Sequence, residues 1–291
     1  FMGGSGDLLR QMSRGIGQLT NNALPTVTSF NLMPVPMFLL MGEIFFHTGL
    51  ANKMFSAVDR LMGRIPGRLS FVTVAGGTAF ATLSGSSLGA TALLGSLMVP
   101  EMQKRGYKKH MAIGPILGTG GLAMLIPPSA LAVLLATLAN LDVGKLLIAG
   151  VVPGLMLAGF YVILILGMCL WDPEAAPSYE VDKSTLVEKL KLLFFDVLPM
   201  MSIVVGVILL ILNGWATPSE SAAFGCLGVL ALAILYGKLT WEGFKNSVHG
   251  ALKVTTMALL IIFGSATFSQ LLEFTGASSG VTKWATQFDL A

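Results

Sequence analysis

The sequence predicts an all-α polytopic membrane protein with a re-entrant helical hairpin and a broken transmembrane helix. Three observations lead to this prediction. The 291 residues are 54% hydrophobic and only 11% charged, whereas soluble proteins carry about 25% charged residues. Long apolar runs alternate with short charged loops that would lie outside the lipid bilayer. Two of these runs carry small polar residues or prolines near their centres, where a regular spanning helix would be apolar.

The apolar runs give the order of the membrane segments. A first span is expected at residues 30–50, a hairpin at 69–100 and a broken span at 110–140. Shorter amphipathic helices at the membrane surface are expected in the second half of 172–191 and at 238–251, where a helix would begin near Thr240. The remaining spans are expected at 146–171, 193–213, 217–236 and 252–274.

Residues 69–100 are predicted to enter and leave the membrane on one side. Each arm has only about 15 residues, and a spanning helix needs about 20. Lys and Arg mark cytoplasmic loops, and the hairpin places fourteen of them in cytoplasmic segments and four outside. A single crossing would leave six inside and twelve outside. The charges therefore favour a re-entrant hairpin, which is a working part of a channel or a transporter.

A short internal repeat is consistent with this topology. Residues 37–54 and 261–284 each close an apolar span with an aromatic residue or His, followed by Thr48-Gly49 or Thr275-Gly276. In the predicted topology the first copy runs inward and the second outward. Many secondary transporters are built from inverted repeats of this kind, although so short a match also arises by chance.

The predicted hairpin tip contains Ser84, Gly85, Ser86, Ser87 and Thr91. Hydroxyls and loosely held carbonyls are hard oxygen ligands that suit an alkali cation. The start of the second arm would offer free N–H groups and a positive dipole end to an anion. The alternative is that these small residues only allow helices to pack closely.

The centre of the 110–140 span is predicted to unwind. Gly120-Gly121 loosens the helix, and Pro127-Pro128 removes two N–H donors just before Ser129. The freed carbonyls would face the hairpin tip, because broken helices at mid-membrane form the ion and solute sites of transporters. A simple proline kink is the alternative.

A third motif begins the 217–236 span. Thr217 as N-cap, Pro218 in the first turn and Glu220 three residues after the cap are the elements of a capping box. The cap explains most of this pattern, and a part in gating or partner contact is the alternative.

Other candidate residues give weaker indications of function. Glu43 lies inside the first span, where an acidic residue is a functional candidate, but near the end at which its carboxylate can reach water. Cys169 and Cys226 lie in apolar runs and are expected to be free thiols. No base is expected at the depth of Ser86 or Ser87, so an intramembrane protease, and enzymatic activity generally, is not expected. A net charge of +3 gives no indication of a nucleic-acid partner.

Residues 84–129, 142–155 and 213–223 together resemble the large membrane subunit of the tripartite ATP-independent periplasmic (TRAP) transporters, in order and in spacing. The resemblance implies an inverted-repeat, elevator-type transporter in a bacterial or archaeal inner membrane. It would import an organic acid, a carboxylate or similar anion, with Na⁺ as the coupling ion and no other cofactor. A periplasmic binding protein would deliver the solute, and a small membrane subunit, separate or fused, would brace the scaffold.

The resemblance also assigns residues to roles. The family's subunit is longer, so we expect this chain to be truncated at both ends and to lack the second hairpin. One sodium site would lie between the first hairpin tip and the broken helix, involving Ser84, Ser86, Ser87, Gly120, Gly121 and Pro127. Substrate binding or gating would involve Gly85, Thr91, Pro128, Ser129, Thr217 and Glu220.

The expected division of the chain follows from these roles. Residues 1–68 would hold a scaffold span and an interfacial helix, 69–140 the transport core, 141–192 a span and a cytoplasmic loop, and 193–291 scaffold spans with the start of the second repeat. A stand-alone sodium/dicarboxylate-type symporter, an ion channel with the hairpin as its filter, and a purely structural membrane scaffold remain alternative interpretations of the same pattern.

Overall fold

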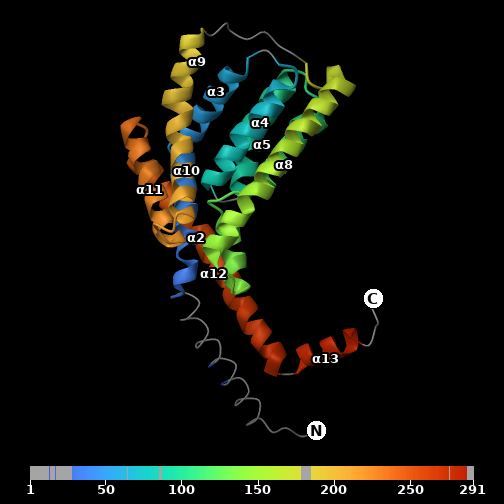
Figure 1. Ribbon diagram of the computed structural model, residues 1–291, viewed down its shortest axis with the longest axis vertical. Coiled ribbons are helices and arrows are strands. Elements are labelled where there is room, and N and C mark those ends of the chain that lie inside the picture. Colours follow the sequence, from blue (N-terminus) through green and yellow to red (C-terminus); the bar gives the residue numbers. More distant parts are fainter. Residues whose placement is uncertain are drawn as a thin grey trace. The chain divides into compact units, whose positions relative to one another are not determined.

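The described part of the chain is helical throughout. A computed structural model describes residues 13, 17, 28–63, 65–84, 87–177, 185–274 and 276–286. Within these ranges every regular element is a helix (Figure 1). The chain divides into two units, residues 31–252 and residues 1–30 with 253–291. The prediction of an all-α protein is confirmed.

The helices follow the predicted order of membrane segments. Five stretches are long and apolar enough to cross a membrane: Phe30–His47, Val143–Trp171, Val187–Leu212, Pro218–Leu235 and Trp241–Gln270. They match the five predicted full spans, so the chain is a multi-pass membrane protein. The helices in chain order are η1 (Phe30–Leu32), α2 (Pro34–His47), α3 (Leu50–Met62), α4 (Arg68–Ser84), α5 (Ser87–Lys104), α6 (Lys109–Leu122), α7 (Ala130–Leu138), α8 (Val143–Trp171), η2 (Pro173–Ala175), α9 (Leu186–Leu192), the π-helical turn η3 (Leu193–Val197), α10 (Leu198–Leu212), α11 (Pro218–Leu235), α12 (Trp241–Phe274) and α13 (Ala277–Ala285).

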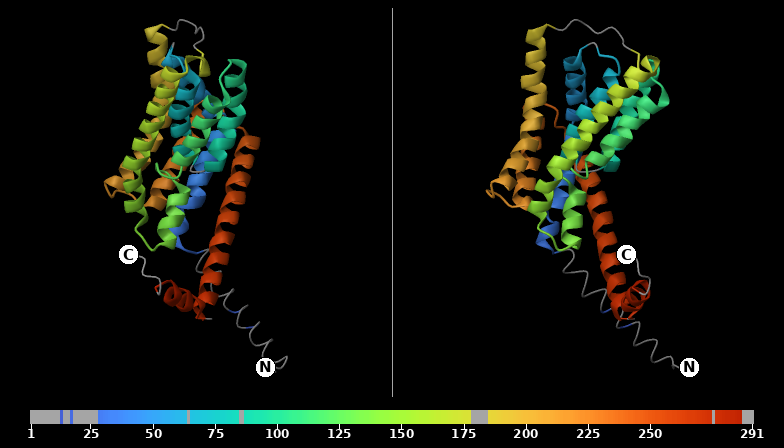
Figure 2. Two further views of the ribbon diagram at one scale, coloured as in Figure 1. Left: turned by 90° about the vertical axis from the view of Figure 1, so that its right-hand side faces the viewer. Right: turned by 45° about the vertical axis from the view of Figure 1, so that its right-hand side comes forward.

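Helices α4 and α5 form a hairpin. They pack against each other and against α6, and α8 runs beside α4 (Figures 1 and 2). The first residues of α4 lie beside those that follow α5, because the Leu69 N–H donates to the Tyr107 hydroxyl at 3.3 Å. One turn away, the Ser70 hydroxyl donates to the Met111 carbonyl at 2.9 Å. The two ends of the segment therefore lie side by side.

A buried ion pair fixes the base of this hairpin to α3. Arg68 Nε lies 2.9 Å from Asp59 Oδ1, and the Arg68 side chain is only 3% exposed. A second guanidinium nitrogen of Arg68 donates to the Asp59 carbonyl. Burial raises the pKa of the Asp59 carboxyl, although the charge of Arg68 lowers it in part. Because both groups have lost water, each depends on the other for its charge to be tolerated.

Residues that follow α8 close the same end. The Ala175 carbonyl accepts from the Lys108 N–H at 2.9 Å, and the Ala176 carbonyl accepts from the Gly67 N–H at 3.3 Å. Lys108 also forms an ion pair with Asp172, whose pKa is lowered by that hydrogen bond. Residues 172–177 thus cover the hairpin base.

Two predicted interfacial helices are parts of longer helices. The predicted helix near 186–191 continues through η3 into α10, since Thr185 and Glu188 form a capping box that starts the helix before the span. The predicted helix at 238–251 begins at Trp241 as expected, with the Thr240 hydroxyl accepting from the Gly243 N–H at 3.0 Å. It then continues to Phe274, because no proline interrupts the segment.

The predicted internal repeat has a common local geometry. After α2, Gly49 adopts φ +72° and α3 follows directly. After α12, Gly276 adopts φ +69° and α13 follows directly. Glycine tolerates this left-handed conformation, which turns the chain from one helix into the next without a loop. Both copies therefore join a span to a short helix through the same turn.

The first test concerns the buried pair at the hairpin base. Replacing Arg68 by Met leaves Asp59 without its partner and should lower the free energy of unfolding by about 2–3 kcal/mol. The matched control is Arg105→Met, which removes an ion pair with Glu101 that is 32% and 43% exposed and should cost less than about 1 kcal/mol. Thermal or denaturant unfolding of the purified protein in detergent measures both, and equal losses would contradict the assignment.

Candidate ion and solute site at the hairpin tip

The predicted break in the 110–140 span is present. Helix α6 ends at Leu122 and α7 begins at Ala130. Pro127 and Pro128 are buried within the intervening segment and offer no N–H. Residues 123–129, called the break below, therefore expose backbone carbonyls inside the protein.

Ser129 closes the break. Its hydroxyl donates to the Met124 carbonyl at 3.0 Å and accepts from the Ala132 N–H at 3.2 Å as the N-cap of α7. The side chain is fully buried. Both of its local partners belong to the break and the following turn, so its observed role is to hold the unwound backbone in place.

The start of α5 lies against the last turn of α6. A Cβ at Gly120 would overlap the Thr91 hydroxyl and would lie 3.6 Å from the Ser87 carbonyl oxygen. One residue earlier on α6, the Thr119 hydroxyl lies 3.1 Å from the Cβ position of Gly77 on α4. The absence of side chains at the two glycines allows this approach. Ser87, Thr91 and Gly120 are thus brought together.

The other predicted site residues have different positions. Ser84 ends α4, while Gly85 and Ser86 at the tip lie outside the described residues. Gly121 lies in the last turn of α6, with open space at its Cβ position. The structure thus places one end of the hairpin turn, at Ser87, next to the last turn of α6.

Thr217 and Glu220 form the predicted capping box at the start of α11. The Thr217 N–H donates to Glu220 Oε2 at 2.7 Å, and the Glu220 N–H donates to the Thr217 hydroxyl at 3.3 Å. The adjacent Pro218 lies 3.9 Å from the Cβ position of Gly144, at the start of α8. These residues cap a helix and form no described contact with the hairpin tip.

Two glycines of α8 also shape the site, and the sequence analysis did not single them out. A Cβ at Gly150 would overlap the Leu125 carbonyl oxygen, and a Cβ at Gly154 would overlap the Ile126 side chain. Their four-residue spacing is the small-xxx-small pattern that lets membrane helices approach closely. That spacing is the signal that could have identified them.

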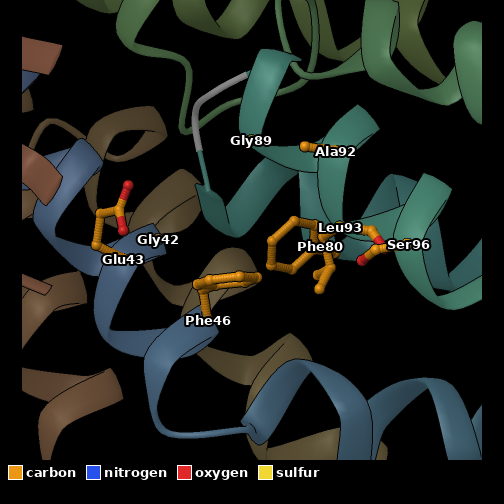
Figure 3. A pocket seen from close by; sticks show the side chains of 8 residues that line it. All are labelled: Gly42, Glu43, Phe46, Phe80, Gly89, Ala92, Leu93 and Ser96. Atoms are coloured by element: carbon orange, nitrogen blue, oxygen red, sulfur yellow. The ribbon is translucent and has the colours of Figure 1, made fainter. Parts of the chain in front are cut away.

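On its other face the hairpin borders a cavity of about 290 Å³. The α5 residues that line it are Gly89, Ala92, Leu93 and Ser96, one face of the helix starting just after the tip (Figure 3). Among the described residues that line this cavity, Glu43 of α2 is the sole ionisable one.

Contacts around Glu43 come from two helices. Its Oε2 lies 3.3 Å from Nδ1 of His47. A Cβ at Gly250 of α12 would lie 2.6 Å from the same oxygen, so only glycine leaves room for the carboxylate. Glu43 therefore stands between protein helices, beside the cavity, rather than simply extending toward water.

The chemistry of this region is that of oxygen ligands. A hydroxyl and a backbone carbonyl lie at the contact between α5 and the last turn of α6, and such oxygens suit hard cations. Among the described residues, no group of three or more His, Cys, Asp or Glu side chains could hold a metal ion. Cys169 and Cys226 are both buried and free, as predicted.

The contact at Gly120 can be tested by filling the space at this position and then restoring it. Gly120→Ala should separate α5 from α6 and lower the Tm of the purified protein by several degrees, because Thr91 cannot move without disturbing α5. Gly114→Ala, with open space at its Cβ position, should be neutral or stabilise by up to about 1 kcal/mol. In the double variant Gly120→Ala/Thr91→Ala the nearest remaining Thr91 atom is 3.5 Å away, so stability should largely recover. A double variant no more stable than Gly120→Ala would contradict the contact.

Comparison with known proteins agrees with this geometry. Residues 8–291 match the family model described as the tripartite ATP-independent periplasmic transporter, DctM component. The chain is 30% identical over 274 residues to the C4-dicarboxylate TRAP transporter large permease protein DctM of Rhodobacter capsulatus, covering 89% of this chain and 61% of that protein.

The names of two further relatives include other solutes. The sialic acid TRAP transporter large permease protein SiaM of Vibrio cholerae is 27% identical over 271 residues, 91% of this chain and 61% of that protein. The 2,3-diketo-L-gulonate TRAP transporter large permease protein YiaN of Escherichia coli is 28% identical over 235 residues, 80% of this chain and 54% of that protein. The chain thus spans about three fifths of the length of these relatives. It belongs to the DctM family of TRAP transporter large permeases.

Proposed function

We propose that this chain forms the first inverted repeat and the start of the second in the large permease of a sodium-coupled TRAP transporter, which imports an organic anion across a bacterial or archaeal inner membrane. The observation that carries the proposal is the contact between the hairpin tip and the broken helix. There, Gly120 lies against Thr91 and the Ser87 carbonyl. The relatives' names include a C4-dicarboxylate, sialic acid and 2,3-diketo-L-gulonate, which supports an organic acid as the solute.

In this proposal the sodium ion binds between the tip and the break. Ligands would come from the carbonyls and hydroxyls of Ser84, Ser86 and Ser87 and from the backbone at Gly120, Gly121 and Pro127. The buried break favours this assignment, because carbonyls that have lost their helical donors retain a strong preference for a cation.

The solute would bind beside the ion at the same tip. The first turn of α5 presents the positive end of a helix dipole, which favours an anion. Gly85, Thr91, Pro128 and Ser129 lie on the segments that would border it. The cavity between α5 and α2 offers a path along the hairpin (Figure 3).

Transport would follow an elevator mechanism. Helices α4–α6, which pack together, would move with α7 as the transport core, while α10 and α11 would belong to the static scaffold. A small membrane subunit would brace that scaffold, and a periplasmic binding protein would deliver the solute. The hairpin is re-entrant in this mechanism, so its tip ends within the membrane.

Sodium coupling can be tested on the full-length permease with its small subunit and binding protein in proteoliposomes. Uptake should require an inward Na⁺ gradient that K⁺ cannot replace, and Na⁺ should raise the Tm relative to choline at equal ionic strength. Ser86→Ala and Ser87→Ala should each raise the Na⁺ concentration for half-maximal uptake about tenfold, the effect of about 1.4 kcal/mol of lost coordination. Ser87→Thr keeps the hydroxyl and should change this concentration less. Equal uptake without a Na⁺ gradient would contradict the coupling.

The re-entrant topology has its own test in whole cells. In a background without Cys169 and Cys226, cysteines at Ile65 and Lys104 should react with reagents only after the cytoplasmic side is opened. A cysteine at Trp215, which is 77% exposed, should react from outside as the matched control. Labelling of positions 65 and 104 from opposite sides would exclude the hairpin.

A further inference from the structure

Helix α3 connects the hairpin to a second group of helices. At one end Asp59 holds Arg68 at the base of α4. At the other end Lys53 contacts η3 and the end of α11 (Figure 1). Any displacement of the hairpin relative to α10 and α11 must therefore change one of these two joints.

Lys53 is held by two different groups. Its ammonium lies 2.9 Å from Asp196 Oδ1 and 3.7 Å from the centroid of the Tyr236 ring. The Asp196 side chain is only 17% exposed and is followed by the largely apolar remainder of the Val187–Leu212 span. A carboxylate in that setting is costly unless it has a cationic partner. The three residues, Lys53, Asp196 and Tyr236, are called the α3 junction below.

The backbone around Asp196 departs from a regular α-helix. Pro199 has no N–H, so the Phe195 carbonyl lacks the donor that a regular helix would supply. The Leu198 N–H instead bonds to the Leu193 carbonyl in a π turn, and the Tyr236 hydroxyl donates to the Phe195 carbonyl. Single π turns inside helices often occur at functional sites. Tyr236 thus contacts the irregular turn through its hydroxyl and Lys53 through its ring.

The two joints of α3 differ in burial. Arg68 is 3% exposed, and separating it from Asp59 would leave charged groups without water or partner. Lys53 is 34% exposed, so water already reaches its ammonium, whereas Asp196 is 17% exposed and must gain water when the pair separates. The joint at Lys53, whose cation lies within reach of water, is therefore the one that can open at the smaller cost.

We propose that the α3 junction is a releasable latch, which holds α3 and the attached hairpin against η3 and α11 in the arrangement observed here and opens when the hairpin moves. The inference rests on the proposed function insofar as the hairpin moves relative to these helices. Asp59–Arg68 then keeps α3 and the hairpin together, while Lys53 leaves Asp196 and Tyr236.

The test measures a distance rather than transport. Spin labels at the exposed positions Ser56 on α3 and Leu235 on α11 report the separation of the two elements in the full-length complex in nanodiscs. Lys53→Met and Asp196→Asn should each raise the population at the longer distance, relative to the population at the shorter distance. We expect a change of about three- to tenfold, from the loss of a partly buried ion pair and, in Lys53→Met, of a cation–π contact. The charge exchange Lys53→Asp/Asp196→Lys should return the ratio toward wild type.

Matched variants separate a latch from a fixed brace. Lys189→Met, near Gly63 on the same side, should leave the distances unchanged. Tyr236→Leu keeps the ion pair and should give a smaller shift in the distances. This variant serves as a second test if the charge-exchange variant does not fold. A lower Tm with an unchanged distance distribution in Lys53→Met and Asp196→Asn would show a static brace and overturn the latch. Sodium-independent uptake would instead refute the proposed coupling, and the distance measurement would still decide the latch.

Discussion

The rest of this structure depends on one constraint: an unwound backbone in a membrane span must find its partners inside the protein. The break between α6 and α7 meets it in three ways. The Ile126 N–H returns to the Leu122 carbonyl at 3.0 Å. The Ser129 hydroxyl donates to the Met124 carbonyl and accepts from the Ala132 N–H. Helix α8 covers the remaining side at Gly150 and Gly154. Because the break is stable only when it is covered, the hairpin, α6–α7 and α8 must pack as one body.

The features that could be predicted from the sequence are those set by local chemistry. Apolar length defines a span, Pro127-Pro128 breaks one, and the spacing of Thr217 and Glu220 defines a cap, each within a few residues. The charge pattern around 69–100 reports on topology, and the adjacent ends of α4 and α5 agree with it.

The features that could not be predicted depend on partners distant in sequence. Asp59 and Arg68 were each ordinary loop charges until the fold placed them 2.9 Å apart. Glu43 was assigned to water because its helix end alone was considered, whereas α5 and α12 enclose it. The separate interfacial helices were wrong because a composition change was taken as a boundary, and no residue there stops a helix. The roles of Ser86 and Gly85 stay predictions, since they lie outside the described residues.

The charges near the tip give a reason for sodium and an anion to be coupled in the proposed mechanism. Among the described residues that line the cavity beside the hairpin, none is basic and one is acidic. In the proposed mechanism an anion at the tip gains positive potential from the helix dipole of α5 and from the bound sodium ion. A sodium ion about 4 Å away would contribute about 4 kcal/mol at an effective dielectric constant of about 20. That attraction corresponds to roughly a thousandfold in affinity, and by linkage the anion strengthens sodium binding by the same factor. A permanent arginine at the tip would bind the anion without the ion and weaken this dependence.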